Sequence, residues 1–200
     1  MTQDASTSGY SQSAQSLITQ YESITFEQVH GPVLRFFPKS PARALDIGAG
    51  TGRDAAALAR LGYAVTAVEP TSELRAWGEA NHPASIRWLA DMLPALDGVR
   101  ALDERFDLVL LTAVWMHLDA GQQREAMRTL AGLLAPGGRI SMTLRHGPVP
   151  EGRRMFDVSG DEVAALARAV GLTEVHQAPR QDMLLRADVN WTFLVLERPA

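Results

Sequence analysis

The chain of 200 residues contains no cysteine, a single lysine (Lys39) and no apolar run long enough to cross a membrane. The absence of cysteine excludes disulfide bonds, thiolate metal sites and every mechanism with a cysteine nucleophile. A membrane-spanning helix needs roughly 20 mostly apolar residues, and the first residues also lack the basic and apolar segments of a signal peptide. We therefore expect a cytoplasmic protein with no membrane partner.

Clustered positive charge is also scarce. The 19 basic residues face 23 acidic ones, which gives a formal net charge of −4. Proteins that bind nucleic acids carry clustered Lys and Arg, so we expect no nucleic-acid partner. A hydrophobic content of 46% indicates one globular domain. The sequence leaves open whether that domain is a monomer or a homodimer.

After residue 42 the chain alternates predicted strands and helices. Strands are expected at 43–47, 64–69, 86–90, 106–112, 139–144, 173–177 and 191–197, and helices at 53–61, 72–80, 120–134 and 160–170. Strands joined by helices pair in parallel with right-handed crossovers. The sequence therefore predicts an α/β fold: a Rossmann-like three-layer αβα sandwich with a seven-stranded, mostly parallel sheet whose last strand is antiparallel. Pro136-Gly137-Gly138 is expected to form a turn.

The first predicted strand ends in a glycine-rich turn. An apolar run reaches Asp46 and then breaks into Gly48, Gly50 and Gly52, just ahead of a helical stretch. Alternate glycines permit positive φ and close approach of a ligand to the backbone. In open α/β sheets this first turn is the usual floor of a nucleoside-cofactor site.

The residue after the glycine turn helps to distinguish between possible nucleoside cofactors. A dinucleotide fingerprint needs a third small residue, and this chain has Arg53 there. The single lysine precedes the first strand, so the chain also has no Tyr-x-x-x-Lys pair. An NAD(P)-dependent Rossmann oxidoreductase is therefore the alternative, together with a non-catalytic cofactor-binding module of the same fold.

Five motifs in order make the chain resemble the class I S-adenosylmethionine-dependent methyltransferases. They are Asp46–Gly52, which matches E/D-x-G-x-G-x-G in full, Glu69-Pro70, Asp91-Met92, Phe106–His117 and Leu134–Arg139. The resemblance implies S-adenosyl-L-methionine as cofactor and S-adenosyl-L-homocysteine as product.

The same resemblance implies a set of cofactor contacts. The glycine loop approaches the methionine moiety, the acid ending the second strand bonds the ribose hydroxyls, and the acid after the third strand accepts from the adenine amino group. The implied cofactor-binding residues are Asp46, Gly48, Ala49, Gly50, Gly52, Arg53, Glu69, Pro70, Asp91, Met92, Thr112, Ala113 and Val114. Taken alone, Glu69 suits the ribose of NAD equally, and Asp91 suits the cap of a turn equally.

Methyl transfer from a sulfonium is an in-line displacement, so holding acceptor and methyl group in line is its main requirement. A general base is optional, and His117 and His146, after the fourth and fifth strands, are the candidates. Hydrogen bonding to the backbone is the alternative for each. Tyr21, Trp115 and Arg145 are candidate substrate contacts, and Arg145 suits an acceptor carboxylate or, equally, the solvated surface.

Residues 1–38 precede the sheet and are expected to form two short helices between Ser13 and Phe37, after a frayed start at Met1 to Gly9. In the resembling family such a segment commonly covers the active site as a lid. We therefore expect one methyltransferase domain over 1–200, with a lid at 1–38 and a core at 42–200. Tyr10, Tyr21 and Phe26 lie in this segment, where they either bury the sulfonium or pack the segment onto the domain.

Several acceptors are disfavoured. The covalent route to pyrimidine C5 needs a cysteine, and Thr112–Trp115 replaces the Asn/Asp-Pro-Pro-Tyr type used on exocyclic amines and glutamine amides. The expected acceptor is a small molecule methylated on oxygen or nitrogen, with no metal involved.

Overall fold

The structure of the protein is a computed structural model that describes residues 14–200. The expected frayed start and Tyr10 lie outside the described residues. The helices are α1 (Ala14–Glu22), α2 (Phe26–His30), the 3₁₀ helix η2 (Gly31–Phe36), α3 (Arg53–Arg60), α4 (Ser72–Asn81), α5 (Asp97–Arg100), the 3₁₀ helix η3 (Trp115–His117), α6 (Ala120–Leu133) and α7 (Gly160–Arg168). The strands are β1 (Arg43–Ile47), β2 (Ala64–Val68), β3 (Arg87–Leu89), β4 (Phe106–Thr112), β5 (Leu134–His146), β6 (Thr173–Gln181) and β7 (Asn190–Glu197).

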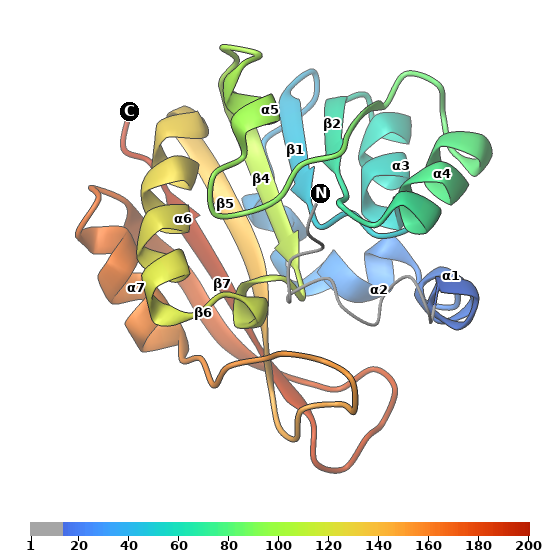
Figure 1. Cartoon of the computed structure of the whole chain (residues 1–200). Coiled ribbons are helices and arrows are strands. Elements are labelled where there is room, and N and C mark those ends of the chain that lie inside the picture. Colours follow the sequence, from blue (N-terminus) through green and yellow to red (C-terminus); the bar gives the residue numbers. More distant parts are fainter. Residues whose placement is uncertain (1–13) are drawn as a thin grey trace.

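The seven strands form one sheet in the order β3-β2-β1-β4-β5-β7-β6 (Figure 1). The pairs among β1 to β5 are parallel, whereas β7 runs antiparallel to both β5 and β6. The predicted fold class, with an antiparallel last strand, is confirmed. The strand order reverses beside β1, and ligands of doubly wound sheets lie in the crevice at this point.

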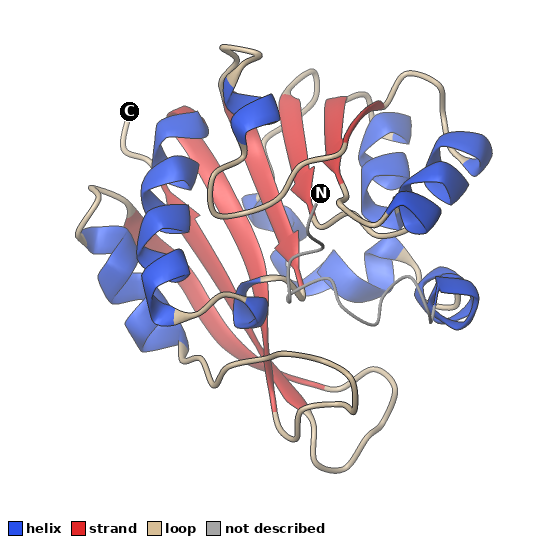
Figure 2. Ribbon diagram, viewed as in Figure 1, coloured by secondary structure: helices blue, strands red, loops and turns tan. Residues whose placement is uncertain are grey.

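Helices cover both faces of the sheet (Figure 2). Residues that alternate along β1 belong to different core clusters: Leu45 and Ile47 pack with α5, α6 and α7, whereas Ala44 packs with α2 and α3. Val33 of η2 packs on β7. Because both faces of β1, β2 and β4 are covered, the central positions of these strands are mostly apolar.

The structure differs from the sequence prediction at the start of β5. The strand begins at Leu134, directly after α6, and so contains Pro136-Gly137-Gly138. The pairing shifts register between Phe106 and Leu108, and the Gly137 N–H bonds the Arg198 carbonyl. The predicted turn is therefore corrected to an irregular strand segment. It keeps strand hydrogen bonds because Gly137 takes a φ of +74°.

The carboxyl ends of β1 and β4 point toward the edge where α1 and α2 lie, and the β5–α7 and β6–β7 connections extend beyond the same edge (Figure 1). Segments far apart in the sequence therefore meet there. Within residues 14–200, no helix has the length and apolarity that a membrane crossing demands.

Candidate functional site

A cavity of about 430 Å³ lies at this carboxyl edge, within the size range of small-molecule sites. Its walls contain every sequence-predicted cofactor residue except Gly52, and also Tyr21, His117 and Arg145. The structure therefore brings most of the predicted site residues together in one cavity. Trp115 and His146 are absent from the walls.

The glycine loop after β1 needs its glycines. Gly48, Gly50 and Gly52 have φ values of +67°, +57° and +87°, in the left-handed region where a Cβ is disfavoured. A Cβ on Gly50 would also lie 3.2 Å from the Tyr21 ring. A Cβ on Gly52 would lie 2.5 Å from Trp88. Gly52 therefore serves the packing of the loop, which explains why it does not line the cavity.

Glu69 holds the glycine loop in place from the end of β2. Its two carboxylate oxygens accept the backbone N–H groups of Gly50 (2.8 Å) and Thr71 (2.7 Å). Burial raises the pKa of Glu69, although both backbone hydrogen bonds act in the opposite direction. Each carboxylate oxygen can accept a further hydrogen bond. Glu69 can therefore anchor the loop and still accept from ligand hydroxyl groups.

Asp46, at the head of the glycine loop, is a buried acid whose hydrogen-bonding capacity is only partly used. It is 1% exposed, and its Oδ2 has no hydrogen-bond partner among residues 14–200. Burial, followed by the charge of Asp54, raises the pKa of Asp46 well above its ordinary value. An unpartnered buried carboxyl group is unfavourable. A cationic or hydrogen-bond-donating ligand group in the cavity would satisfy it.

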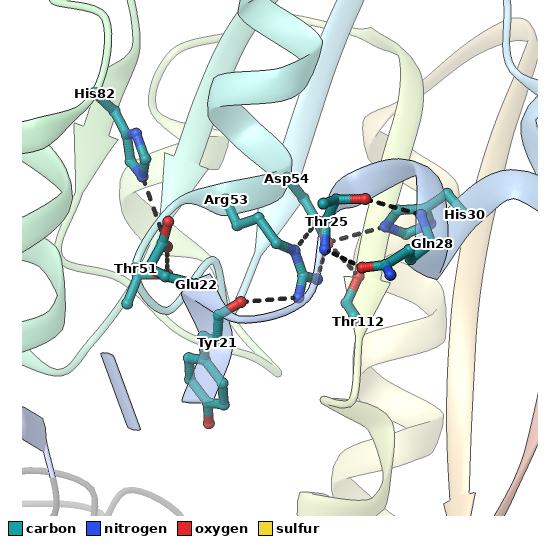
Figure 3. Close-up of polar contacts among 10 residues, drawn as sticks. All are labelled: Tyr21, Glu22, Thr25, Gln28, His30, Thr51, Arg53, Asp54, His82 and Thr112. Carbon is teal, nitrogen blue, oxygen red and sulfur yellow. Dashed lines mark hydrogen bonds and ion pairs between the residues drawn. The ribbon is translucent and has the colours of Figure 1, made fainter. Parts of the chain in front are cut away.

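Asp54 is the centre of a buried polar cluster that the sequence reasoning missed (Figure 3). Its carboxylate accepts hydrogen bonds from His30 Nε2 (2.9 Å), Arg53 Nε (2.7 Å) and Thr112 Oγ1 (2.9 Å). Burial alone would raise the pKa of Asp54, but His30 and Arg53 outweigh it and the net pKa is strongly lowered. The only sequence signal was an acidic residue in the first turn of the helix after the glycine loop.

The N-terminal helices are attached to the glycine loop by further polar contacts (Figure 3). Thr51 Oγ1 donates to Glu22 at 2.6 Å, and Arg53 Nη1 donates to the Tyr21 carbonyl at 3.5 Å. A capping box between Thr25 and Gln28 begins α2 and presents its last residue, His30, to Asp54. Residues of this segment therefore form one wall of the cavity.

Asp91 lies where the sequence placed it, but the backbone already uses both of its oxygens. They accept the N–H groups of Met92 (2.8 Å) and Val99 (3.0 Å). Asp91 therefore stabilises the backbone after β3, as the alternative interpretation expected. Because Asp91 and Met92 also line the cavity, the contact with an adenine amino group stays a prediction.

His117 faces the cavity with a defined tautomer. Its Nδ1 lies 2.9 Å from the Arg154 carbonyl, and a carbonyl oxygen only accepts, so Nδ1 carries the proton and Nε2 of the neutral ring has the lone pair. Burial lowers the pKa of His117 below its ordinary value of 6.5. The ring is therefore neutral at pH 7 and suited to accept a proton.

Two predicted site residues lie elsewhere, and both predictions are corrected. Trp115 is fully buried in the core that packs under α6, because the 3₁₀ turn of η3 directs its ring inward. His146 follows Arg145 on β5, and successive strand residues face opposite sides. Its Nε2 bonds Thr192 at 2.8 Å instead of facing the cavity.

The far end of the cavity is basic and was largely missed. Arg145 was expected, but Arg180 and Asp182 at the end of β6 and Arg186 in the β6–β7 connection also line it. The sequence reasoning ended the sixth strand at residue 177 and found no pattern beyond it. No local periodicity marks these residues, because only the pairing of β6 with β7 brings them to β5.

These features define a class of protein. A doubly wound sheet with a glycine loop after β1 and a carboxylate at the end of β2 is the arrangement of nucleoside-cofactor-binding α/β proteins. The family described as "Methyltransferase domain" matches residues 21–177. The chain belongs to this family, which confirms the resemblance seen in the motifs.

A curated relative and two solved structures give the extent of the similarity. A Mycobacterium tuberculosis protein named as an uncharacterized methyltransferase is 34% identical over 107 residues, covering 52% of this chain and 40% of the relative. This chain thus spans less than half of that relative.

The first solved structure is the 1,6-didemethyltoxoflavin-N1-methyltransferase of Burkholderia thailandensis with bound 1,6-didemethyltoxoflavin and S-adenosylhomocysteine. It is 23% identical with a TM-score of 0.64, covering 94% of this chain and 87% of its own. The second is the N-methyltransferase NodS of Bradyrhizobium japonicum in complex with S-adenosylhomocysteine, 22% identical with a TM-score of 0.67, covering 88% and 89%. At these identities the two structures show the shared fold.

Proposed function

We propose that the protein is an S-adenosylmethionine-dependent methyltransferase that methylates oxygen or nitrogen of a small molecule. The observation that carries this proposal is the cofactor end of the cavity. There a glycine loop at positive φ, anchored by Glu69, lies next to Asp46, whose Oδ2 has no hydrogen-bond partner in the described part of the chain. Membership of the methyltransferase domain family supports the reaction class.

The residues present fit this cofactor. Because Gly50 has no Cβ, the space between its backbone and the Tyr21 ring stays open. The amino-acid tail of the cofactor could lie against the backbone there. Asp46 offers a buried carboxylate oxygen to a cationic group. Glu69 has lone pairs left for two hydroxyl groups, and Asp91 with Met92 lines the adjoining wall for a planar base.

When bound, S-adenosylmethionine supplies a methyl carbon whose bond to sulfur breaks with the electron pair left on sulfur. The chain's own contribution is to hold the acceptor in line with this carbon, which is worth up to ~7–11 kcal/mol for well-oriented groups. Nε2 of His117 takes the proton that a hydroxyl or ammonium acceptor loses, contributing roughly 10²–10⁴-fold. The N-terminal helices close one side and exclude water.

The loop after β4 supports this geometry. Ala113 has a φ of +61°, an uncommon conformation for a residue with a side chain. Its N–H donates to the Thr143 hydroxyl on β5 at 2.9 Å, which offsets part of the strain. This fixed backbone lines the same cavity as the glycine loop and His117, and it would help to hold a bound cofactor in place relative to His117.

The proposal extends to the domain organisation, the location and the oligomeric state of the protein. Residues 1–38 act as the lid and 42–200 as the catalytic core of one domain. The enzyme works in the cytoplasm as a monomer or homodimer, without nucleic acid. The nicotinamide alternative is less compatible with this site because the Arg53 side chain occupies the position of the third small residue and bonds Asp54.

Calorimetric titration of the purified chain with S-adenosylmethionine, S-adenosylhomocysteine and NADH tests the cofactor. Both sulfur nucleosides should bind, whereas NADH should not. Gly50→Val should abolish binding because its side chain would need a positive φ and would contact Tyr21. Gly132→Val, on exposed α6 with open space around its Cβ, is the matched control. Tight NADH binding without sulfur-nucleoside binding would overturn the proposal.

A further inference from the structure

The acceptor end of the cavity contains a row of side chains that crosses three strands. Arg145 on β5 is paired with Trp191 on β7, and Trp191 is paired with Arg180 on β6. Side chains of directly paired residues lie on the same face of a sheet, and all three line the cavity. Because neighbouring strands are about 4.8 Å apart, the two arginine backbones are about 10 Å apart.

Within residues 14–200, neither arginine of this row forms an ion pair with a carboxylate. Arg145 Nη1 donates a long hydrogen bond of 3.4 Å to the Gly147 carbonyl. Arg180 lies over the Phe193 ring, 5.2 Å from its centroid. Both guanidinium groups are therefore held by packing without being neutralised.

The carboxylate nearest to the row is already engaged. Asp182 accepts two hydrogen bonds from Arg186, at 2.7 and 2.9 Å, and one from Trp191 Nε1 at 2.8 Å. These contacts strongly lower the pKa of Asp182, led by the hydrogen bonds from Arg186. Asp182 thus makes its direct contacts with Arg186 and the Trp191 ring, and it compensates the charges of Arg145 and Arg180 only in part and at longer range.

The surroundings make an uncompensated charge costly. Arg145 is only 9% exposed, and its pKa is lowered first by burial and then by Arg186, while Asp182 acts in the opposite direction. Burial also lowers the pKa of Arg180; the charge of Asp182 acts in the opposite direction, and Arg53 adds a smaller lowering effect. Guanidinium groups stay protonated in proteins. A ligand anion between them would relieve both desolvation and repulsion.

The cavity is therefore polarised along its length. Around the ends of β1 to β3 the lining contains four carboxyl groups and one arginine, Arg53, whereas around β5 to β7 it contains the arginine row and Arg186 with one carboxylate, Asp182. A cationic cofactor suits the first end and an anion the second. A planar guanidinium binds carboxylate or phosphate oxygens through two parallel hydrogen bonds, and Trp191 between the arginines offers a flat apolar surface.

We propose that the methyl acceptor is a small organic anion, a carboxylate or a phosphate ester, whose charged group is bound by Arg145 and Arg180. This inference rests on the proposed methyltransferase function, because it concerns the second substrate of the same site. It makes the row a specificity determinant: the anionic group sets the orientation in which the acceptor's nucleophile reaches the cofactor end.

The test uses the full chain and methyl-labelled S-adenosylmethionine with a bacterial metabolite extract divided by ion exchange into anionic, neutral and cationic fractions. Label should enter the anionic fraction. The variants Arg145→Gln and Arg180→Gln should each lower kcat/KM for that fraction roughly tenfold or more, and Arg145→Lys should lose less. Arg128→Gln, an exposed arginine on α6, is the matched control and should transfer label at the wild-type rate.

S-adenosylhomocysteine binding, measured by calorimetry on every variant, separates the possible failures. It should be unchanged in Arg145→Gln and Arg180→Gln, which also shows that these variants are folded. Label entering the neutral or cationic fraction alone, or an unchanged rate in both arginine variants, would overturn the anion inference while leaving the methyltransferase function standing. Absence of transfer to every fraction would contradict both. Labelled anionic products that lose their charge with phosphatase would identify phosphate esters, and resistant ones carboxylates.

Discussion

At the scale of single residues, three buried carboxyl groups in the cofactor end have different tasks. Asp46 has one oxygen, Oδ2, that finds no partner among residues 14–200. Glu69 joins two turns through backbone hydrogen bonds, and Asp54 joins the start of α3 to α2. Their environments explain the opposite directions of their pKa shifts. Burial dominates at Asp46 and Glu69 and raises the pKa, whereas His30 and Arg53 overcome burial at Asp54 and lower it.

Replacing Glu69 by Ala should weaken binding of S-adenosylhomocysteine by about 1–3 kcal/mol, because the Gly50 and Thr71 N–H groups lose their acceptor. Glu69→Gln keeps one carbonyl oxygen as an acceptor, so its affinity for S-adenosylhomocysteine should lie between those of the wild type and Glu69→Ala. Calorimetry gives the affinities, with Glu125→Ala on the exposed side of α6 as control. Wild-type affinity in Glu69→Ala would show that another residue holds the ribose.

The neutral state of His117 leads to a prediction about pH. Because burial lowers its pKa below 6.5, the ring is an available base at pH 7 and becomes protonated only in more acidic solution. The value of kcat/KM should therefore be maintained at pH 6.5 and fall only in more acidic solution. His117→Gln should remove this acid limb and lower kcat by roughly 10²–10⁴-fold.

The control for this profile is His176→Gln, on β6, where the ring stacks on Phe36 away from the cavity. Its pH profile should match that of the wild type. An acid limb that persists in His117→Gln would assign the titration to another group.

Residues that belong to a local motif were predictable. The three glycines form the predicted turn and Glu69 follows its strand, because short-range spacing fixes where a strand and its turn end; Gly52 nevertheless lies outside the cavity lining. The contact between His30 and Asp54 could not be predicted, because it joins residues that are 24 positions apart in the sequence. Trp115 was misplaced because the sequence does not reveal that η3 turns its ring into the core.

At the scale of elements, α1 and α2 are attached to the α3 N-terminus through polar contacts as well as apolar packing. His30 of α2 and Arg53 of α3 share one carboxylate, and Glu22 of α1 accepts from Thr51. The position of the N-terminal wall of the cavity is therefore coupled to the conformation of the glycine loop.

Replacing Asp54 by Asn should destabilise the protein by about 2–4 kcal/mol, because the change leaves buried donors and an arginine without their anion. The folded-state pKa of Asp54 is lowered, so its contribution is complete above the unfolded value of about 3.9 and is lost as the pH falls through the folded value. The difference in unfolding free energy between wild type and variant should therefore be full at pH 7 and shrink below pH 4.

Urea denaturation at a series of pH values measures this difference. Limited trypsin digestion should also cleave after Arg35 faster in Asp54→Asn, since η2 follows the released α2. Asp97→Asn, an exposed carboxylate on α5, should behave as wild type in both assays. Equal stability of Asp54→Asn at pH 7 would refute the attachment.

The alternating strands and helices were predicted well, and short isolated helices were not. The predicted strands and the helices α3, α4, α6 and α7 match the structure within two positions, except at the start of β5 and the end of β6. The helices η3 and α5 contain three and four residues, show no pattern and were not predicted. β6 extends four residues beyond its predicted end at 177 because pairing with β7 stabilises residues that have no strand-like sequence.

At the scale of the whole molecule, the sheet brings two chemically different ends together in one cavity. Parallel strands β1 and β2 deliver the glycine loop and Glu69, whereas the antiparallel addition of β7 and the long β6 deliver Trp191 and Arg180 beside Arg145. The first end belongs to the doubly wound core, and the second depends on how far β5, β6 and β7 extend past it.

A crystal structure of the chain with S-adenosylhomocysteine tests this account most directly. We expect the nucleoside to contact Glu69 and Asp91, its amino-acid tail to lie on the glycine loop beside Asp46, and the row of Arg145, Trp191 and Arg180 to remain accessible to a second ligand. Density for the nucleoside outside this cavity, or with its carboxylate bound to Arg145 and Arg180, would contradict the division of the cavity into a cofactor end and an acceptor end.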